Sequence, residues 1–255
     1  MRQARLRTDG GIVRGQYRDG RIVADDGEYR VGRDGSLTYP CSPSAIYCVG
    51  RNYADTLEQM DYERPSEPDF FIKPPASLLG HGDAIRYPRW TDELTYAGEL
   101  AAVVGRRFRD VPAGAVSEVI RGYTILNDVD ALDQAGRTAR KAFDGSGPLG
   151  PWIETDLDPV GIGMKTVING ETRQDSNTKL MLFDPSEIVS VHAPPRGRDR
   201  VRQPGEPGDG HPRRRDRNHV HRRRDASEPS RGGIRRRVGV ILYRITDRRQ
   251  RRGRQ

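Results

Sequence analysis

The apolar pattern that builds strands and helices ends at Ser190 in this chain of 255 residues. Before Ser190, short apolar runs alternate with turn residues. Residues 191–255 consist mainly of Arg, Pro, Gly, Asp and His, and VGVILYRI is their one apolar run. A segment of this composition buries too little apolar surface to offset the entropy lost on ordering. We therefore expect the folded part to lie within residues 1–190 and the tail, 191–255, to be disordered.

The two parts also differ in charge. Residues 1–190 hold 23 basic and 29 acidic residues, a net charge of −6, whereas residues 191–255 hold 21 arginines and 7 acidic residues, a net charge of +14. The overall net charge of +8 therefore does not describe a uniformly basic surface. Nucleic-acid binding through the tail is one interpretation of the arginines. We do not expect specific recognition, because Tyr243 is the only aromatic residue in the tail that can stack on bases.

The sequence shows no sign of a membrane segment or a secretory signal. It has no run of 18 apolar residues, and the N-terminal MRQARLRTDGG lacks an apolar core. We expect a soluble, cytoplasmic protein without a membrane partner. Cys41 and Cys48, the only cysteines, are expected to be small packing residues, and His81 a surface or packing residue in a loop.

Residues 1–42 are expected to form a small N-terminal β domain. Between residues 10 and 40, three Asp-Gly dipeptides, at 19–20, 26–27 and 34–35, separate short β-prone runs. Asp and Gly tolerate the positive φ angles of tight turns, so the pattern predicts a meander of hairpins.

Residues 43–190 predict further strands with short helices, and so an α+β, mainly β fold. Apolar runs predict strands at 45–50, 69–75, 94–105, 122–128 and 165–170. Ala97-Gly98 indicates a bulge or a close backbone approach within the third of these strands. Asn169-Gly170 predicts a hairpin turn. Helices are expected within 53–60 and from Pro185, where Asp184 and Glu187 have the spacing of a capping box.

Six blocks between about Ile46 and Ser190 resemble the fumarylacetoacetate hydrolase family in order and spacing. They are CVGRNYADTLEQM, FFIKPPASLLGHGD, YAGELAAVVG, GYTILNDVDALD, KAFDGSGPLGPWI and INGETRQDSNTKLMLFDPSEIV. The resemblance implies a mixed β-roll with a small N-terminal domain, of which 43–190 is an incomplete catalytic domain. It also implies a homodimer that binds Mg²⁺ or Mn²⁺ and acts on a small 2-oxo or β-dicarbonyl acid as a hydrolase, isomerase or decarboxylase.

The resemblance places metal-ligating carboxylates at Glu99 and Asp128. The family's Glu-x-Glu pair reads Ala97-Gly98-Glu99 here, so one ligand is missing. Water or Asp130 is expected to fill its place, and metal binding is expected to be weaker. The alternative, judged from the residues alone, is a solvated acidic strand face.

The family's proton-transfer pair is replaced in this chain. Its pattern, Asn-Tyr-x-Asp-His with Glu three residues later, reads NYADT from Asn52 to Thr56, followed by Gln59. The resemblance assigns the catalytic positions to Thr56 and Gln59, but neither side chain titrates near neutrality. We therefore expect tautomerisation or isomerisation rather than hydrolysis, with Asp55, Glu58 or a metal-bound hydroxide as the base.

Three further positions follow from the resemblance. Lys141, one of four lysines, is expected to face the site as a partner of a carboxylate or enolate, with an exposed lysine as the alternative. Asn52 and Gln174 are expected to bind substrate. Leu132 stands where many relatives have an arginine that holds a substrate carboxylate.

The segment PGDGHPRRRD, residues 207–216, stands where the family has a Gly-Thr-Pro loop and final strands. Shifting a GC-rich reading of it by one nucleotide can give Pro-Ala-Thr-Gly-Thr-Pro-Ala-Gly-Val. We therefore hypothesise that residues 191–255 are the product of a frameshift. A non-catalytic, acid-binding member of the same fold is the competing interpretation of the substituted site.

Overall fold

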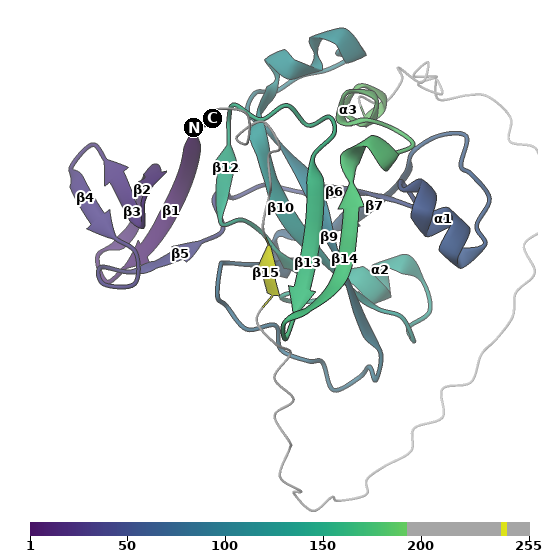
Figure 1. Cartoon of the computed structure of the whole chain (residues 1–255), viewed down its shortest axis with the longest axis horizontal. Helices are drawn as coiled ribbons and strands as arrows, with labels where there is room; N and C mark the ends of the chain where they lie inside the picture. The colour runs from purple at the N-terminus through teal and green to yellow at the C-terminus, as the bar shows by residue number, and fades with distance from the viewer. Residues whose placement is uncertain (193–240, 244–255) are drawn as a thin grey trace, which may run out of the picture.

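The computed structural model describes the backbone of residues 1–192 and 241–243 (Figure 1). Side chains are described for these residues except Gln59, Met60, His192 and 241–243. The Arg-rich stretches behind the frameshift and nucleic-acid hypotheses lie outside the described residues. Within the described part, no helix is long and apolar enough to span a membrane.

The N-terminal residues form the predicted meander of hairpins, seen in purple in Figure 1. Its strands are β1 (Arg2–Thr8), β2 (Gly11–Arg18), β3 (Arg21–Ala24), β4 (Gly27–Arg30) and β5 (Ser36–Thr38). The turn between β2 and β3 has φ angles of 44° at Asp19 and 80° at Gly20. Positive φ at both central residues matches the twist of the flanking strands, which is why Asp-Gly closes this hairpin.

The meander continues into the main sheet of the molecule. The strand order is β4-β3-β2-β1-β12-β10-β9, and β5 pairs with β1. In this sheet β9 spans Leu94–Val104, β10 spans Ile120–Ala131 and β12 spans Trp152–Glu154. Because β1 pairs with β12, a boundary at residue 42 divides one continuous sheet. The meander still has its own apolar cluster of Ala4, Leu6, Ile22 and Leu37.

Three smaller sheets complete the fold, which is α+β and mainly β as predicted. β6 (Ile46–Gly50) pairs with β7 (Asp69–Lys73), and β8 (Leu78–Leu79) pairs with β11 (Gly147–Pro148). β13 (Gly163–Ile168) pairs with β14 (Glu171–Asn177) through a turn with φ of 52° at Asn169 and 85° at Gly170. This confirms the Asn-Gly hairpin.

One short part of the tail is a strand, contrary to the expectation of disorder. β15 (Ile241–Tyr243) pairs antiparallel with β13, opposite Thr166 to Ile168. It comes from the tail's one apolar run, and β13 presents a free edge to it. A strand that joins an unpaired edge gains backbone hydrogen bonds, and an apolar run has no polar side chains that compete for them.

The helices are short. They are α1 (Ala54–Met60), α2 (Arg137–Lys141) and α3 (Pro185–His192), with 3₁₀ turns η1 (Pro75–Ser77), η2 (Ala113–Glu118) and η3 (Thr178–Leu180). Asp184 Oδ1 accepts from the backbone N–H groups of Ser186 at 2.7 Å and Glu187 at 2.8 Å, and Glu187 Oε2 accepts from the Asp184 N–H at 2.8 Å. This reciprocal pair is the predicted capping box.

The backbone at Gly98 makes the predicted close approach, but there is no bulge. β9 pairs with β10 in unbroken register from Leu94 to Val103, and the register shift lies between Ile120 and Gly122. The Gly98 N–H donates to Gln174 Oε1 at 2.9 Å, and Gln174 Nε2 donates to the Gly98 carbonyl oxygen at 3.0 Å. Gln174 therefore fastens the β13–β14 sheet to β9.

Candidate active site

One face of the β9–β10 pair gathers the predicted metal carboxylates. Asp128 lies directly opposite Ala97, and Leu126 lies directly opposite Glu99. Opposite residues of an antiparallel pair point to the same face, and so do residues two apart along one strand. Glu99 and Asp128 are thus diagonal neighbours on one face, and the methyl group of Ala97 stands directly across from Asp128.

The Glu99 carboxyl group is electrostatically coupled to this face. Glu99 as a residue is partly exposed, but its carboxyl group is enclosed by protein. Burial, followed by the negative charge of Asp128, raises the pKa of Glu99 to about 8, while Lys141 opposes the shift. The effect of Asp128 on this pKa indicates that the two carboxyl groups lie within electrostatic reach of each other.

Asp128 lies between the ammonium groups of Lys73 and Lys141. Its Oδ2 accepts a short hydrogen bond from Lys141 Nζ, and its Oδ1 lies 3.0 Å from Lys73 Nζ. The contact with Lys73 is an ion pair, and among the described residues the buried Oδ1 accepts no hydrogen bond of good geometry. Oδ1 therefore keeps a lone pair that no hydrogen bond occupies.

Asp130, the expected substitute for the missing ligand, is already engaged. Arg140 donates to both of its carboxylate oxygens, at 2.8 Å and 2.6 Å, and Lys141 Nζ lies 3.2 Å from Oδ2. Burial favours the neutral carboxyl, but the bonds from Arg140 and the nearby Lys141 outweigh it and lower the pKa of Asp130. This pairing holds Asp130 as a partner of α2 and leaves it poorly placed to bind a metal.

Strand β7 presents one face to helix α2. Asp69, Phe71 and Lys73 alternate onto that face, as the period of a strand requires. Arg137 donates to Asp69 at 2.6 Å and 2.8 Å, and the Arg137 guanidinium and the Lys141 ammonium lie 5.5 Å and 4.9 Å from the Phe71 ring centroid. These contacts place the Lys141 ammonium group beside both Phe71 and Asp128, while its role toward a substrate stays a prediction.

Asn52 and Gln174, the two predicted substrate-binding residues, both bond to backbone groups of neighbouring segments. Asn52 Nδ2 donates to the Phe183 carbonyl oxygen at 2.9 Å, and Asn52 Oδ1 accepts from the Phe183 N–H at 3.0 Å. Besides its two bonds to Gly98, Gln174 Oε1 accepts from Thr166 Oγ1 at 2.8 Å. Both side chains hold neighbouring segments of the site together.

Helix α1 carries the positions of the missing proton-transfer pair. Thr56 is exposed, and the side chain of Gln59 lies outside the described part of the structure. Leu132 is 38% exposed, and its apolar side chain cannot offer a substrate the positive charge of an arginine. His81 is exposed, and Cys41 and Cys48 are partly buried free thiols.

The donor set fits a divalent cation that keeps several water ligands. Among the described residues, no group of three or more His, Cys, Asp or Glu side chains is arranged around a metal position. Glu99 and Asp128 Oδ1, which is ion-paired with Lys73 but accepts no hydrogen bond, offer hard oxygen ligands on one face. Magnesium is often held by one or two carboxylates plus water and ligand oxygens, so two acidic residues suffice for a weak site.

A comparison with protein families decides which fold family this is. Residues 45–194 match the family profile described as fumarylacetoacetate (FAA) hydrolase C-terminal. The chain belongs to the fumarylacetoacetate hydrolase family. The elements that carry the candidate site, β9, β10 and α2, all lie within the matched residues.

The relatives of this fumarylacetoacetate hydrolase family member include enzymes. A Mycobacterium tuberculosis protein is 41% identical over 163 residues, which cover 61% of this chain and 62% of the relative. The aligned part of the chain thus spans less than two thirds of that relative. The crystal structure of 5-carboxymethyl-2-hydroxymuconate delta-isomerase from Mycobacterium smegmatis is 36% identical, with a TM-score of 0.69 over 76% of this chain and 81% of the isomerase.

A third relative contains a metal. Maleylpyruvate hydrolase from Sphingobium, solved with manganese(II) and pyruvate, is 25% identical, with a TM-score of 0.64 over 76% of this chain and 83% of the hydrolase. Divalent-metal binding is therefore a property found within the family.

The sequence reasoning missed four residues that the structure places at the site: Lys73, Phe71, Arg137 and Arg140. Lys73 left a readable signal, because it is a lysine on the inward face of an apolar strand in a chain with only four lysines. Arg137 and Arg140 left no such signal, because the sequence alone does not distinguish them from solvent-exposed arginines on a short helix.

Proposed function

We propose that this protein is a divalent-metal-dependent enzyme that tautomerises or isomerises a small 2-oxo or β-dicarbonyl acid. The observation that carries the proposal is the pairing on one strand face of Glu99 with a buried Asp128 oxygen that lacks a hydrogen-bond donor. Support also comes from the isomerase relative and from the manganese and pyruvate bound to another relative.

The proposed metal is Mg²⁺ or Mn²⁺, held by Glu99 and Asp128. Such a cation supplies positive charge that polarises the carbonyl of an oxo-acid. The residues of the chain surround that position with further charge. Lys141 brings an ammonium group beside Asp128, where it can bind a substrate carboxylate or the negative charge that develops on the carbonyl oxygen.

The exposed Thr56 supports tautomerisation over hydrolysis. Water activation needs a base that titrates near neutrality, which a threonine hydroxyl is not. Enolisation of an already polarised carbonyl requires a weaker base. Asp55 and Glu58, both exposed on α1, remain the side-chain candidates for that proton transfer.

The test is an oxaloacetate enolisation assay during titration with Mn²⁺ or Mg²⁺. We expect a metal-dependent rate that Glu99→Ala reduces to the metal-free rate, because one of two carboxylate ligands is lost. Glu58 is exposed on α1 and is a candidate base. Glu58→Gln should therefore lower the rate without weakening metal binding, which separates it from Glu99→Ala. A rate that ignores the metal, or that survives Glu99→Ala, contradicts the proposal.

A non-catalytic member that binds an acid is the second candidate. The exposed Thr56 and the methyl group of Ala97 opposite Asp128 favour it, because they weaken both proton transfer and metal binding. Isothermal titration with oxalate and pyruvate, followed by turnover assays over a panel of oxo-acids, distinguishes the two. Binding without turnover of any acid in the panel selects the second candidate.

The homodimer, the cytoplasmic location and the division at residue 42 stay predictions, as does the frameshift. Sedimentation velocity at micromolar concentration measures the first. Resequencing the gene across the codons for residues 190–216 checks the frameshift. An intact frame, with no neighbouring insertion or deletion, contradicts it.

A further inference from the structure

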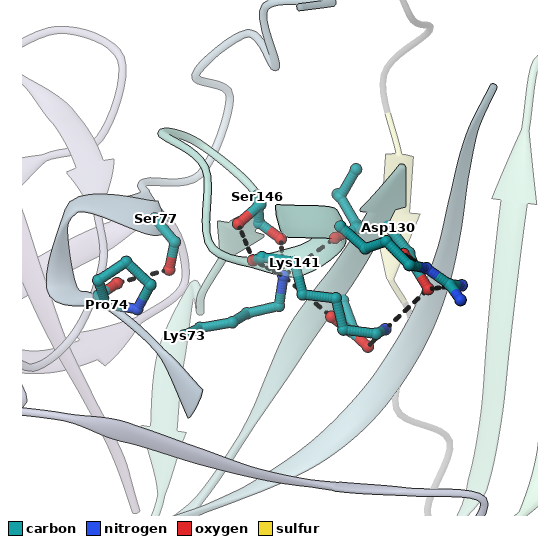
Figure 2. A network of polar contacts seen from close by, with 9 residues as sticks. Lys73, Pro74, Ser77, Asp130, Lys141 and Ser146 are labelled. Atoms are coloured by element: carbon teal, nitrogen blue, oxygen red, sulfur yellow. Dashed lines mark hydrogen bonds and ion pairs between the residues drawn. The ribbon is translucent and has the colours of Figure 1, made fainter. Parts of the chain in front are cut away.

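The side chain of Lys73 is fully buried at the end of β7. Its ammonium group donates to three backbone carbonyl oxygens: Val129 at 3.0 Å, Lys141 at 2.8 Å and Ser146 at 2.9 Å. An ammonium group has three N–H donors, so the three carbonyls use all of them. Figure 2 shows the side chain reaching from β7 toward Ser146 and the backbone of Lys141.

This saturation explains the unusual state of Asp128 Oδ1. The oxygen lies 3.0 Å from Lys73 Nζ, close enough to feel the full positive charge. Three carbonyl oxygens and Asp128 Oδ1 surround an ammonium group that has only three N–H donors, and Oδ1 is the one of the four that accepts no hydrogen bond. The charge of Lys73 therefore favours a carboxylate at this position without covering the oxygen's lone pairs.

The same ammonium group also fixes the backbone of Lys141. The Lys141 carbonyl oxygen accepts from Lys73 Nζ at 2.8 Å and from Ser146 Oγ at 2.7 Å. Lys73 thus contacts the side chain of one site residue and the main chain of another, and joins β7, β10 and the segment after α2. A purely structural role would need only the three carbonyl contacts.

We propose that Lys73 is a positioning residue, whose carbonyl-saturated ammonium group orients Asp128 and keeps its Oδ1 uncapped for a divalent cation. The proposal rests on the proposed metal position at Asp128. It predicts an effect whose sign separates it from simple charge repulsion. Removing a nearby positive charge strengthens cation binding if repulsion dominates, and weakens it if orientation dominates.

The experiment measures Mn²⁺ binding to the full chain by electron paramagnetic resonance, in the unchanged protein and in Lys73→Met. We expect the variant to bind Mn²⁺ about tenfold more weakly or worse, the usual effect of removing an outer partner of a metal ligand. Ser146→Ala removes one donor to the Lys141 carbonyl but keeps the three acceptors of Lys73, and should bind Mn²⁺ as the unchanged protein does. Leu6→Ala, which destabilises the distant meander, controls for lowered stability.

Equal or tighter Mn²⁺ binding by folded Lys73→Met overturns the proposal. If the unchanged protein binds no Mn²⁺, the proposed function fails, and thermal unfolding still tests the Lys73–Asp128 contact. Lys73→Met leaves Asp128 with one cation fewer, so adding Asp128→Asn should raise the melting temperature of that variant. A double variant that melts no higher than Lys73→Met alone shows that Lys73 acts through the carbonyls only, and the proposal is then wrong.

Discussion

The N-terminal meander and the candidate active site are stabilised by different forces. The meander packs Ala4, Leu6, Ile22 and Leu37 into a small apolar cluster. The site buries Lys73 and Asp128 among hydrogen bonds and ion pairs. The stabilisation from apolar burial scales with the buried area and requires no particular partner, whereas a buried ion is stable only beside a group of opposite charge. Substitutions in the meander should therefore lower the free energy of unfolding, and substitutions in the site should change metal or substrate binding.

Leu6→Ala tests the meander and has the largest expected effect on stability. Leu6 is fully buried, so the change removes apolar contacts and leaves a cavity, at a cost of about 3–4 kcal/mol in the free energy of unfolding. Urea unfolding followed by circular dichroism measures it. The exposed Ile12→Ala on β2 should change the same free energy by less than about 0.5 kcal/mol. Similar losses from both would mean that the cluster does not stabilise the meander.

Gln174→Ala tests the polar contact between the β13–β14 sheet and β9. The change removes two hydrogen bonds to Gly98 and one to Thr166, and should cost about 1–3 kcal/mol, because the Gly98 backbone groups lose their partner. Urea unfolding measures this loss too. Gln134→Ala, which loses a single bond to the Trp90 carbonyl, is the control and should cost less. An unchanged substrate KM in folded Gln174→Ala would contradict the predicted role of Gln174 in substrate binding.

Ala97→Glu is expected to convert the weak metal site into a stronger one. Position 97 lies directly opposite Asp128, so a glutamate there adds a third carboxylate to the same face. Mn²⁺ affinity should rise about tenfold, ~1.4 kcal/mol, by isothermal titration. Without metal the variant should melt at a lower temperature than the unchanged protein, since like charges face each other. Ala97→Gln has the same size without the charge, and an equal gain in affinity there would rule out carboxylate ligation.

Asp69→Asn has the smallest expected effect on stability. Its dependence on pH tests whether the effect comes from the ionised carboxylate. Hydrogen bonds from Arg137, followed by those from Arg51, outweigh burial and lower the pKa of Asp69. A carboxyl whose folded pKa is depressed stabilises the protein above its unfolded pKa and loses that contribution as pH falls through the folded pKa. Because both arginines are more than a third exposed, we expect only about 1 kcal/mol at pH 7.

Urea unfolding at pH 7 and at stepwise lower pH measures this contribution. The difference between Asp69→Asn and the unchanged protein should shrink below about pH 4, where the carboxyl becomes protonated in the unfolded chain. The exposed Asp25→Asn in the β3–β4 turn should show little difference at any pH. A difference for Asp69 that does not vary with pH would show that the arginine contacts do not stabilise the fold.

Much of the fold could be predicted because its signals are local. The turns at Asp19-Gly20 and Asn169-Gly170 need positive φ, and the cap at Asp184 needs two residues at fixed spacing. Each is decided within a few residues. The bulge at Ala97-Gly98 was a wrong alternative because a glycine in a strand also marks a close approach, and the partner, Gln174, lies far along the chain.

By itself the sequence indicated the family, the position of several strands along the chain, and the acidic residues Glu99 and Asp128. Only the tertiary structure decided what surrounds them: Arg140 engages Asp130, Asn52 and Gln174 bind backbone groups, and Lys73 lies against Asp128. A buried polar side chain takes its role from the partners available where the chain brings it. Those partners come from separate strands and helices, so no local pattern in the sequence records them.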